Sequence, residues 1–477
     1  MKKLIIIFAI IVFSYCTPKK ENRNPTDKIT EIENYLEALN KKEIFSGAVL
    51  IAKNDSVIFQ KAYGYANLNH KIPNSLNTKF NIASMGKMFT GVAIMQLVQE
   101  GILSVNDKVG KFLPEYPNNL VRDSVSIHQL LTHTSGLPDF MTPEYYESSK
   151  DKYRKLTDFS RLYQSKELAY PSGTRFVYCN SDYLVLGLII EKVTGLTFDQ
   201  YLEKNIYGKA VMTNTGNYMR DHVIENMAVG YTHSNIYPEK LMNNIYVSTV
   251  SGGPAGGEYS TLNDIFNFSK GIKNNLFLNP YNTEILITGK VDDNTYAYGF
   301  TDIKTNNHRI IGHSGGHLGV ACELRMFEDI GYTVIILTNR DAEDGFLDAR
   351  YFIQKQLTGS TPSIESYYNT KSIVESILKK QDSLKQEVIL KNHNLREDMI
   401  NVEGYHQLSI GNYDIAITLF KLATTEFPES SNAFDSLGEA YMVSGDTLKA
   451  IKAYEKSLYL DTLNINATEK LRVLKTK

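Results

Sequence analysis

With 477 residues, the chain is long enough for two or three domains. Its content of 42% hydrophobic and 22% charged residues is ordinary for a globular protein, and its formal net charge of -2 gives no reason to expect nucleic acid as a partner. The three cysteines, Cys16, Cys179 and Cys322, are too few and too scattered for a disulfide framework or a cysteine-based zinc site.

The N-terminus is typical of an export signal. A Met-Lys-Lys start precedes ten apolar residues at 4–13, a run too short for a bilayer, which takes about 20 residues to cross. Cys16 and a polar stretch follow, in an order that resembles a bacterial lipoprotein signal, where such a cysteine becomes the lipidated first residue. We expect a signal peptide over 1–16, a linker over 17–28 and a lipid-anchored protein facing the periplasm or cell surface. Cleavage without lipidation, giving a soluble periplasmic product, is the alternative.

Helical and β-rich segments then follow one another along the chain. Apolar spacing predicts an amphipathic helix over 29–39, and two β-rich runs, 45–52 and 57–64, flank an Asn-Asp turn and predict a hairpin. After a helical, loop-rich middle, strands are expected over 298–300, 308–311, 319–327 and 332–338. Because strands occur at both ends with helices between them, we expect an α+β fold. Its antiparallel sheet would be closed by N- and C-terminal strands, flanked by helices and interrupted by a helical insertion.

A candidate nucleophile lies at Ser84, where a predicted helix opens. Lys87 follows three residues later, on the same helical face, so its amine can reach the serine hydroxyl. A buried lysine that loses its proton can act as a base, and free N–H groups at a helix N-terminus suit a developing oxyanion. Since Ser-x-x-Lys also occurs by chance in most long sequences, it needs partners elsewhere in the chain.

Two later clusters supply such partners. One is Tyr178-Cys179-Asn180, and the other is His313-Ser314-Gly315 followed by Gly316. Together with Ser84-x-x-Lys87, and in this order, they resemble the motifs of the serine β-lactamase and penicillin-binding-protein superfamily. The resemblance is to the branch of class C β-lactamases, D,D-carboxypeptidases, D-aminopeptidases and related esterases, and it covers about residues 40–350.

The resemblance implies a β-lactamase-like fold and a role for each motif. Ser84 would be the acylated nucleophile, Lys87 its proton partner, and Tyr178 a base toward Ser84 and later toward water. Asn180 would hydrogen-bond the substrate amide and the lysine. Cys179, at the variable position of its motif, is interpreted as a small buried packing residue.

The third motif would bind substrate and carries the main departure from the family. Gly315 would let the strand backbone approach the substrate, and the N–H groups of Ser84 and Gly316 would form the oxyanion hole. His313 stands where a lysine is more familiar; a lysine is a permanent cation for a substrate carboxylate, whereas histidine near pH 7 is often neutral. The resemblance therefore does not by itself imply efficient β-lactam hydrolysis, and histidine at this position also occurs in peptidases and amidases of the family.

Other patterns suggest rival sites. Gly312-x-Ser314-x-Gly316 matches the nucleophile elbow of α/β-hydrolases, but β-rich runs follow it, where that fold needs a helix and further catalytic residues. The glycine-rich run at 251–257 lacks the ending of a phosphate loop and predicts a tight turn. His128 and His133 lie on different faces of a short predicted helix and are interpreted as polar packing residues. No carboxylate accompanies His308, His313 and His317, so neither a metal nor a cofactor is expected.

The C-terminal part predicts a separate helical module. Residues 397–430 and 431–464 repeat with a period of 34, with small residues at matching places such as Gly404 and Gly438. This pattern resembles tetratricopeptide repeats, each a pair of helices. We expect a helical connector over 356–396 and repeats over 397–477, with the last residues as a cap. The repeats would either stack on the enzyme or bind a protein or peptide partner.

These observations define one hypothesis and one alternative. The hypothesis is an exported serine hydrolase with its catalytic domain over 29–355, which forms an acyl-enzyme on Ser84. Its substrate would be a small molecule or peptide with an amide or ester bond, such as a D-amino-acid peptide, an ester or a β-lactam-like compound. The alternative is a catalytically silent, penicillin-binding-like sensor or scaffold that acts through its repeats.

Overall fold

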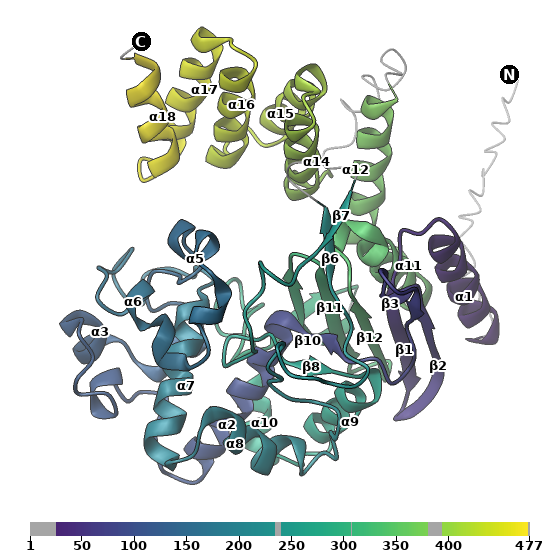
Figure 1. The fold of residues 1–477 in the computed structure, drawn as a ribbon, viewed down its shortest axis with the longest axis vertical. Coiled ribbons are helices and arrows are strands. Elements are labelled where there is room, and N and C mark those ends of the chain that lie inside the picture. Colours follow the sequence, from purple (N-terminus) through teal and green to yellow (C-terminus); the bar gives the residue numbers. More distant parts are fainter. Residues whose placement is uncertain (1–24, 234–239, 307, 380–393, 476–477) are drawn as a thin grey trace, which may run out of the picture.

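The computed structural model describes residues 25–233, 240–306, 308–379 and 394–475, and the signal segment with Cys16 lies outside them. An α+β domain is followed by an all-helical region, which lies above it in Figure 1. This confirms the predicted fold class. None of the helices in the described ranges is both long and apolar enough to cross a membrane.

A six-stranded sheet forms the centre of the α+β domain, in the order β2-β1-β12-β11-β10-β9. Each pair of neighbouring strands in this sheet is antiparallel, and the N-terminal hairpin joins the C-terminal strands where Val49 pairs with Ile336. The hairpin turns at Asn54 and Asp55, both with positive φ, a conformation that these two residue types tolerate. The closure of one sheet by strands from both ends is confirmed. The strands are β1 (Gly47–Lys53), β2 (Ser56–Tyr63), β9 (Thr301–Thr305), β10 (His308–His317), β11 (Val320–Phe327) and β12 (Tyr332–Thr338).

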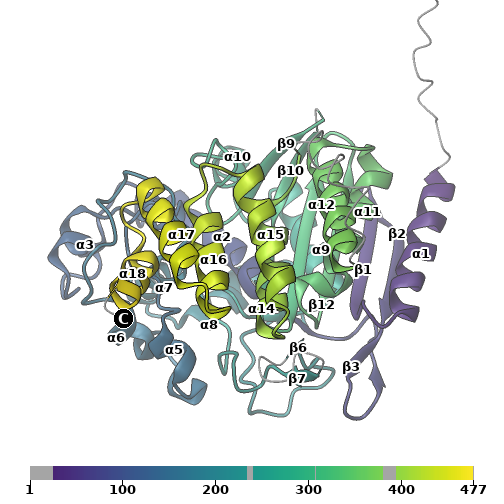
Figure 2. The same cartoon turned by 90° about the horizontal axis from the view of Figure 1, so that it is seen from above.

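Helices cover both faces of this sheet, because successive side chains of each strand point to opposite sides. Val49 and Ile51 pack in one apolar cluster with α1 (Pro25–Lys41) and α11 (Leu347–Thr358). Ala48 and Leu50 belong to a larger cluster with α2 (Lys87–Gln99) and α9 (Leu262–Lys273) on the other face. Figures 1 and 2 show α1 and α11 beside the strands β1 and β2.

Both expected ends of the catalytic domain, residues 29 and 355, and one expected strand differ from the structure. Helix α1 begins at Pro25, so residues 25–28 are helical rather than linker; proline needs no donor in a first helical turn. Helix α11 continues to Thr358, three residues beyond the expected domain end. Residues 298–300 form a turn and not a strand, because Gly299 has a φ of +79° and any Cβ there would lie 2.4 Å from the Lys87 carbonyl oxygen.

The helical insertion lies between β2 and β9 and contributes most of the large apolar cluster. Its α-helices are α3 (Asn119–Ser124), α4 (Ile127–Leu131), α5 (Pro143–Glu147), α6 (Ser160–Tyr163), α7 (Asn180–Thr194), α8 (Phe198–Leu202) and α10 (Pro280–Ile287), in addition to α2 and α9. Short strand pairs accompany them: β3 (Tyr65–Asn67) with β4 (Ile72–Pro73), β5 (Phe80–Asn81) with β8 (Tyr259–Ser260), and β6 (Tyr231–His233) with β7 (Leu241–Asn243).

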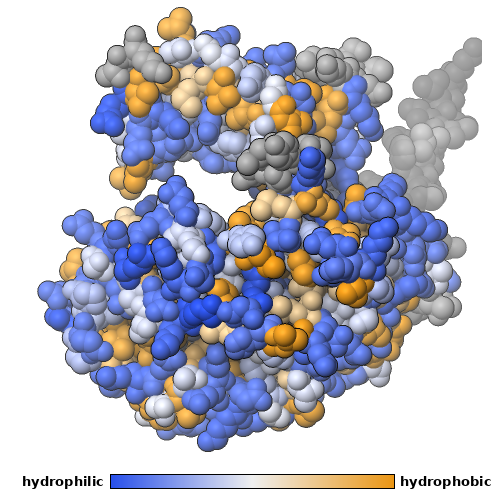
Figure 3. Space-filling view, in the orientation of Figure 1, coloured by the Kyte–Doolittle hydropathy of each residue, from blue (hydrophilic) through white to orange (hydrophobic). Residues whose placement is uncertain are grey.

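The C-terminal region consists of antiparallel helix pairs. Gly404 and Gly438 lie where the two helices of a pair approach closely: a Cβ at Gly404 would be 2.5 Å from the Phe420 ring, and one at Gly438 would be 2.9 Å from the Tyr454 ring. The helices run across the α+β domain when seen from above (Figure 2), and part of them is separated from it by an open space (Figure 3). They are α12 (Pro362–Leu378), α14 (Glu397–Ser409), α15 (Tyr413–Glu426), α16 (Ser431–Val443), α17 (Thr447–Leu460) and α18 (Ile465–Lys475).

Candidate active site

Ser84 lies in a 3-10 turn, Ala83–Gly86, that leads directly into α2. The α-helix itself begins at Lys87, so Ser84 precedes it rather than opening it. Ala83 has a φ of +41°, which is uncommon for a residue with a side chain, and its N–H donates to the side chain of Asn81 at 2.8 Å. The glycine-rich run, predicted only as a tight turn, packs here: a Cβ on Gly256 would lie 2.1 Å from the Ala83 carbonyl oxygen.

The Lys87 amine is fully buried and contacts the candidate nucleophile. Its Nζ donates to Ser84 Oγ at 3.2 Å, to Asn180 Oδ1 at 2.8 Å and to the Ala255 carbonyl oxygen at 2.6 Å. These three acceptors use the three N–H groups of an ammonium. When Lys87 is neutral, the same nitrogen is placed to accept the Ser84 hydroxyl proton. The structure therefore brings the predicted Ser84–Lys87–Asn180 group together.

A carboxylate that the sequence did not indicate fixes the Asn180 amide. Asp139 Oδ2 accepts from the Asn180 backbone N–H at 2.7 Å and from Asn180 Nδ2 at 2.9 Å. With Nδ2 committed in this way, Oδ1 faces Lys87. Asp139 lies in the loop between α4 and α5 and belongs to none of the three motifs, so no spacing signal could have identified it.

Tyr178 is placed beside the same amine. Lys87 Nζ lies 4.8 Å from the centroid of the Tyr178 ring, a cation-π distance, and the tyrosine is 37% exposed. The neighbouring Cys179 is buried, as its interpretation as a packing residue requires. The contact joins the predicted base to the predicted proton partner, and the base role itself stays a prediction.

His313 is buried in β10 and is not a cation. Its Nε2 lies 3.2 Å from Tyr296 Oη, and its Nδ1 contacts the Ser314 carbonyl oxygen. Burial, followed by the charge of Lys87, lowers the pKa of His313 to about 3. The side chain is therefore neutral at pH 7, as the sequence suggested.

Strand β10 also rules out the α/β-hydrolase elbow. Ser314 lies within the strand and pairs with Glu323 of β11, so no strand-to-helix turn exists at this position and the rival interpretation is wrong. Gly315 also has a packing role that the sequence did not indicate, and its expected role toward substrate stays a prediction. A Cβ there would be 2.5 Å from the Ile82 carbonyl oxygen, so its missing side chain lets β10 pack against the turn that carries Ser84.

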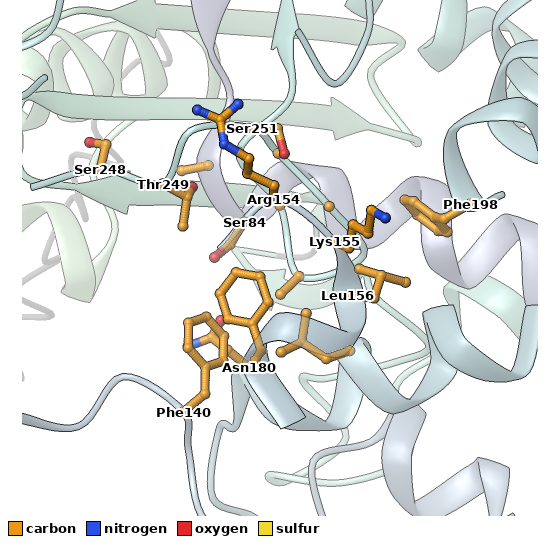
Figure 4. Close-up of a pocket in the computed structure, with 18 of the residues that line it drawn as sticks. Ser84, Phe140, Arg154, Lys155, Leu156, Asn180, Phe198, Ser248, Thr249 and Ser251 are labelled. Atoms are coloured by element: carbon orange, nitrogen blue, oxygen red, sulfur yellow. The ribbon is translucent and has the colours of Figure 1, made fainter. Parts of the chain in front are cut away.

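A cavity of about 540 Å³ opens beside Ser84. Ser84, Asn180 and Gly316 line it, which places three of the predicted site residues at one space. Figure 4 shows Ser84 among Phe140, Asn180 and Leu156, with Phe198 farther along. The wall is mainly apolar on the side of Phe140, Met141, Leu156, Phe159, Leu184 and Phe198. Such a wall suits an apolar group of a substrate.

The two histidines near residue 130 are hydrogen-bonded, as their interpretation as packing residues predicted. His128 Nδ1 lies 2.8 Å from Tyr298 Oη. His133 is fully buried and contacts both Asp182 and Tyr296. The second of these contacts reaches the active site, because Tyr296 is the partner of His313.

Comparison with known proteins agrees with this geometry. A family model described as Beta-lactamase matches residues 32–358. A penicillin-binding protein of Bacillus subtilis (strain 168) is 29% identical over 339 residues, covering 68% of this chain and 74% of that protein. The protein Flp of Staphylococcus aureus (strain MRSA252) is 29% identical over 332 residues, and the match spans 65% of its length.

A solved structure gives the same result for the fold. The penicillin-binding protein from Bacillus halodurans has 29% sequence identity and a TM-score of 0.61, covering 67% of this chain and 98% of that one. The matched region contains the sheet, the helical insertion and all three motifs, and it ends with helix α11 at residue 358. The chain therefore belongs to the β-lactamase and penicillin-binding-protein family of serine hydrolases.

Proposed function

We propose that this protein forms an acyl-enzyme on Ser84 and cleaves an amide or ester bond, with D-amino-acid peptides, esters and β-lactam-like compounds as the substrate class. The observation that carries the proposal is the Lys87 amine, which joins Ser84 Oγ at 3.2 Å to Asn180 Oδ1 at 2.8 Å beside an open cavity. Similarity to penicillin-binding proteins supports the same chemistry.

The proposed reaction has two stages. Ser84 Oγ attacks the substrate carbonyl carbon while its proton passes to the neutral Lys87 amine or, where the Lys87 ammonium favours the Tyr178 phenolate, to that phenolate. The N–H groups of Ser84 and Gly316 stabilise the tetrahedral oxyanion, and the leaving amine or alcohol takes the proton as its bond to carbon breaks. Water then attacks the acyl-enzyme and gives a proton to the Tyr178 phenolate. Tyr178 passes this proton to Ser84 Oγ as the acyl C–O bond breaks, which releases the acid and restores the Ser84 hydroxyl.

The neutral His313 narrows the substrate class. A substrate carboxylate would find no permanent cation at the position where the family more often has lysine. The apolar wall of the cavity instead favours substrates whose recognised group is apolar. We therefore infer that esters and peptide amides without a required carboxylate react faster than penicillins.

The test labels the purified protein with a fluorescent fluorophosphonate and a fluorescent penicillin. We expect covalent labelling that is lost in Ser84→Ala and strongly slowed in Lys87→Ala, with Ser104→Ala, on an exposed loop, as the matched control. Labelling that survives in Ser84→Ala would refute the assignment. A protein that is neither labelled nor able to turn over esters or D-peptides would support the alternative, a silent sensor or scaffold.

Export and anchoring belong to the same proposal. The basic start, the apolar run and Cys16 support a lipoprotein that faces the periplasm or cell surface. Growth with an alkyne-tagged fatty acid should label the wild-type protein and leave Cys16→Ser unlabelled; equal labelling would refute lipidation at this residue. The helical repeats are proposed to bind a protein or peptide partner.

A further inference from the structure

The backbone and ring of His133 hold the segment that contains Tyr178. The His133 carbonyl oxygen accepts from the Val177 N–H at 3.0 Å, and its Nδ1 accepts from the Cys179 N–H at 3.2 Å. These two hydrogen bonds lie on either side of Tyr178 in the chain. His133 itself has a φ of +55°, an uncommon backbone conformation that is retained in a fully buried position.

The other ring nitrogen of His133 leads to strand β10. Nε2 lies 3.0 Å from Tyr296 Oη, and this hydroxyl lies 3.2 Å from His313 Nε2. Tyr296 is buried. One continuous chain of hydrogen bonds, His133–Tyr296–His313, therefore joins the second catalytic motif to the third.

The hydrogen-bond donors and acceptors along His133–Tyr296–His313 determine which nitrogen of each histidine carries the proton. Because His133 Nδ1 accepts from a backbone N–H, its proton is on Nε2 and is donated to Tyr296 Oη. The Tyr296 hydroxyl must then donate to His313 Nε2, which leaves the His313 proton on Nδ1, facing the Ser314 carbonyl oxygen. Each ring is neutral, and each nitrogen and hydroxyl has one defined role.

The surroundings of His133 support this assignment. Asp182 Oδ2 lies 3.3 Å from His133 Nδ1, which carries no proton in this assignment. Because a carboxylate would place two acceptors against each other, the assignment requires a protonated Asp182 carboxyl. Burial raises the pKa of Asp182 well above its ordinary value, and burial lowers the pKa of His133. Ser135 Oγ donates to the other oxygen of Asp182.

We propose that His133 and Tyr296 are positioning residues, whose hydrogen-bond chain fixes the spacing between the Tyr178–Asn180 segment and strand β10 around Ser84. Neither residue lines the cavity or touches Ser84 in the described contacts, so their effect on the reaction passes through Tyr178 and His313. The kinetic part of this inference rests on the proposed acylation of Ser84.

The first experiment measures the rate of fluorophosphonate labelling in variants of the full chain. Tyr296→Phe removes only the hydroxyl. His133→Asn keeps an acceptor for the Cys179 N–H and tolerates positive φ, but it is too short to reach Tyr296. Each variant should label about tenfold more slowly, the loss expected for one buried hydrogen bond. The double variant should be no slower than the slower single variant, because both changes break the same chain.

A second tyrosine–histidine pair, the buried Tyr298 and the half-buried His128, gives a control. Tyr298→Phe removes the hydroxyl that lies 2.8 Å from His128 Nδ1, only two residues from Tyr296. We expect a similar change in melting temperature but an unchanged labelling rate. The proposal would be overturned if the fold-losses in labelling rate of the two single variants multiplied in the double variant, or if Tyr298→Phe slowed labelling as much as Tyr296→Phe. Either result would mean that the slower labelling comes from general destabilisation.

The second experiment does not depend on acylation. In ¹⁵N-labelled protein, His133 should give the signals of the neutral Nε2–H tautomer and His313 those of the neutral Nδ1–H tautomer. The reverse tautomers, or a charged ring at either position at pH 7, would overturn the hydrogen-bond chain. If the wild-type protein is not labelled at Ser84, the proposed function fails, whereas these signals still decide the inference about His133 and Tyr296.

Discussion

Glu258 provides the most direct test of the electrostatics around the nucleophile. Its side chain is fully buried, and neither carboxyl oxygen has a hydrogen-bond partner within the described residues. The carboxyl packs against the turn that carries Ser84, since a Cβ on Gly86 would lie 1.9 Å from Glu258 Oε2. Burial raises the pKa of Glu258 to about 8, although the nearby Lys87 lowers it. The buried group is therefore a neutral acid at pH 7.

This raised pKa makes folding stability depend on pH. The ordinary pKa of the side chain is 4.5, so between that value and about 8 the folded protein binds one more proton than the unfolded chain. Stability consequently falls as the pH rises through this window and levels off above it. One pKa unit is worth about 1.4 kcal/mol, which limits the total loss from Glu258 to about 5 kcal/mol.

Glu258→Gln removes this ionisation while retaining nearly the same shape. The variant should have a stability close to that of the wild type near pH 4.5 and should exceed it by several kcal/mol at pH 8. Urea unfolding followed by circular dichroism at pH 5, 6, 7 and 8 measures the difference. A difference that stays constant with pH, or that favours the wild type at pH 8, would refute the assignment of a neutral buried acid.

Three further substitutions probe other contacts. Burial raises the pKa of Glu323 to about 7, so this carboxyl is ionised at pH 8, where the Arg325 and Arg350 side chains contact its Oε2 at 2.8 and 2.9 Å. Glu323→Gln should therefore destabilise the protein by about 3 kcal/mol in the urea assay at pH 8, the opposite sign to Glu258→Gln. Gly315→Ala places a Cβ 2.5 Å from the Ile82 carbonyl oxygen; we expect about 1–3 kcal/mol of destabilisation and slower labelling of the protein. Gly404→Val drives a side chain into the Phe420 ring, and limited proteolysis should show an opened C-terminal region while fluorophosphonate labelling keeps its wild-type rate.

The fold and the three motifs were accessible from the sequence because they leave local patterns. Strands β1 and β12 are buried almost throughout, and their continuous apolar runs predict strands. The Asn54–Asp55 turn between two β-rich runs predicts the hairpin. Ser84 and Lys87 are three residues apart, so their contact is nearly a local property of the chain. These predictions needed no knowledge of distant contacts.

The supporting residues leave no such pattern. Asp139 reaches Asn180 across 41 residues, and Tyr296 reaches His133 across 163. Each looks like an ordinary polar or aromatic side chain until the helical insertion folds onto the sheet. The proposed role of His133 could not be read from the sequence for another reason. Its Nδ1 contacts the Cys179 N–H and its Nε2 contacts Tyr296, and the sequence does not show which partner each ring nitrogen has.

Glycine residues mark a further kind of contact, for which the sequence shows the glycine but not the segment that packs against it. The run that contains Gly256 predicted a tight turn, and Gly315 predicted close approach of the strand backbone to substrate. In the structure both pack against the same short segment: Gly256 against Ala83, and Gly315 against Ile82. A turn with a φ of +41° at Ala83 needs neighbours that hold it from several sides. The two glycines thus let two distant segments pack against the turn that places Ser84 in the wall of the cavity.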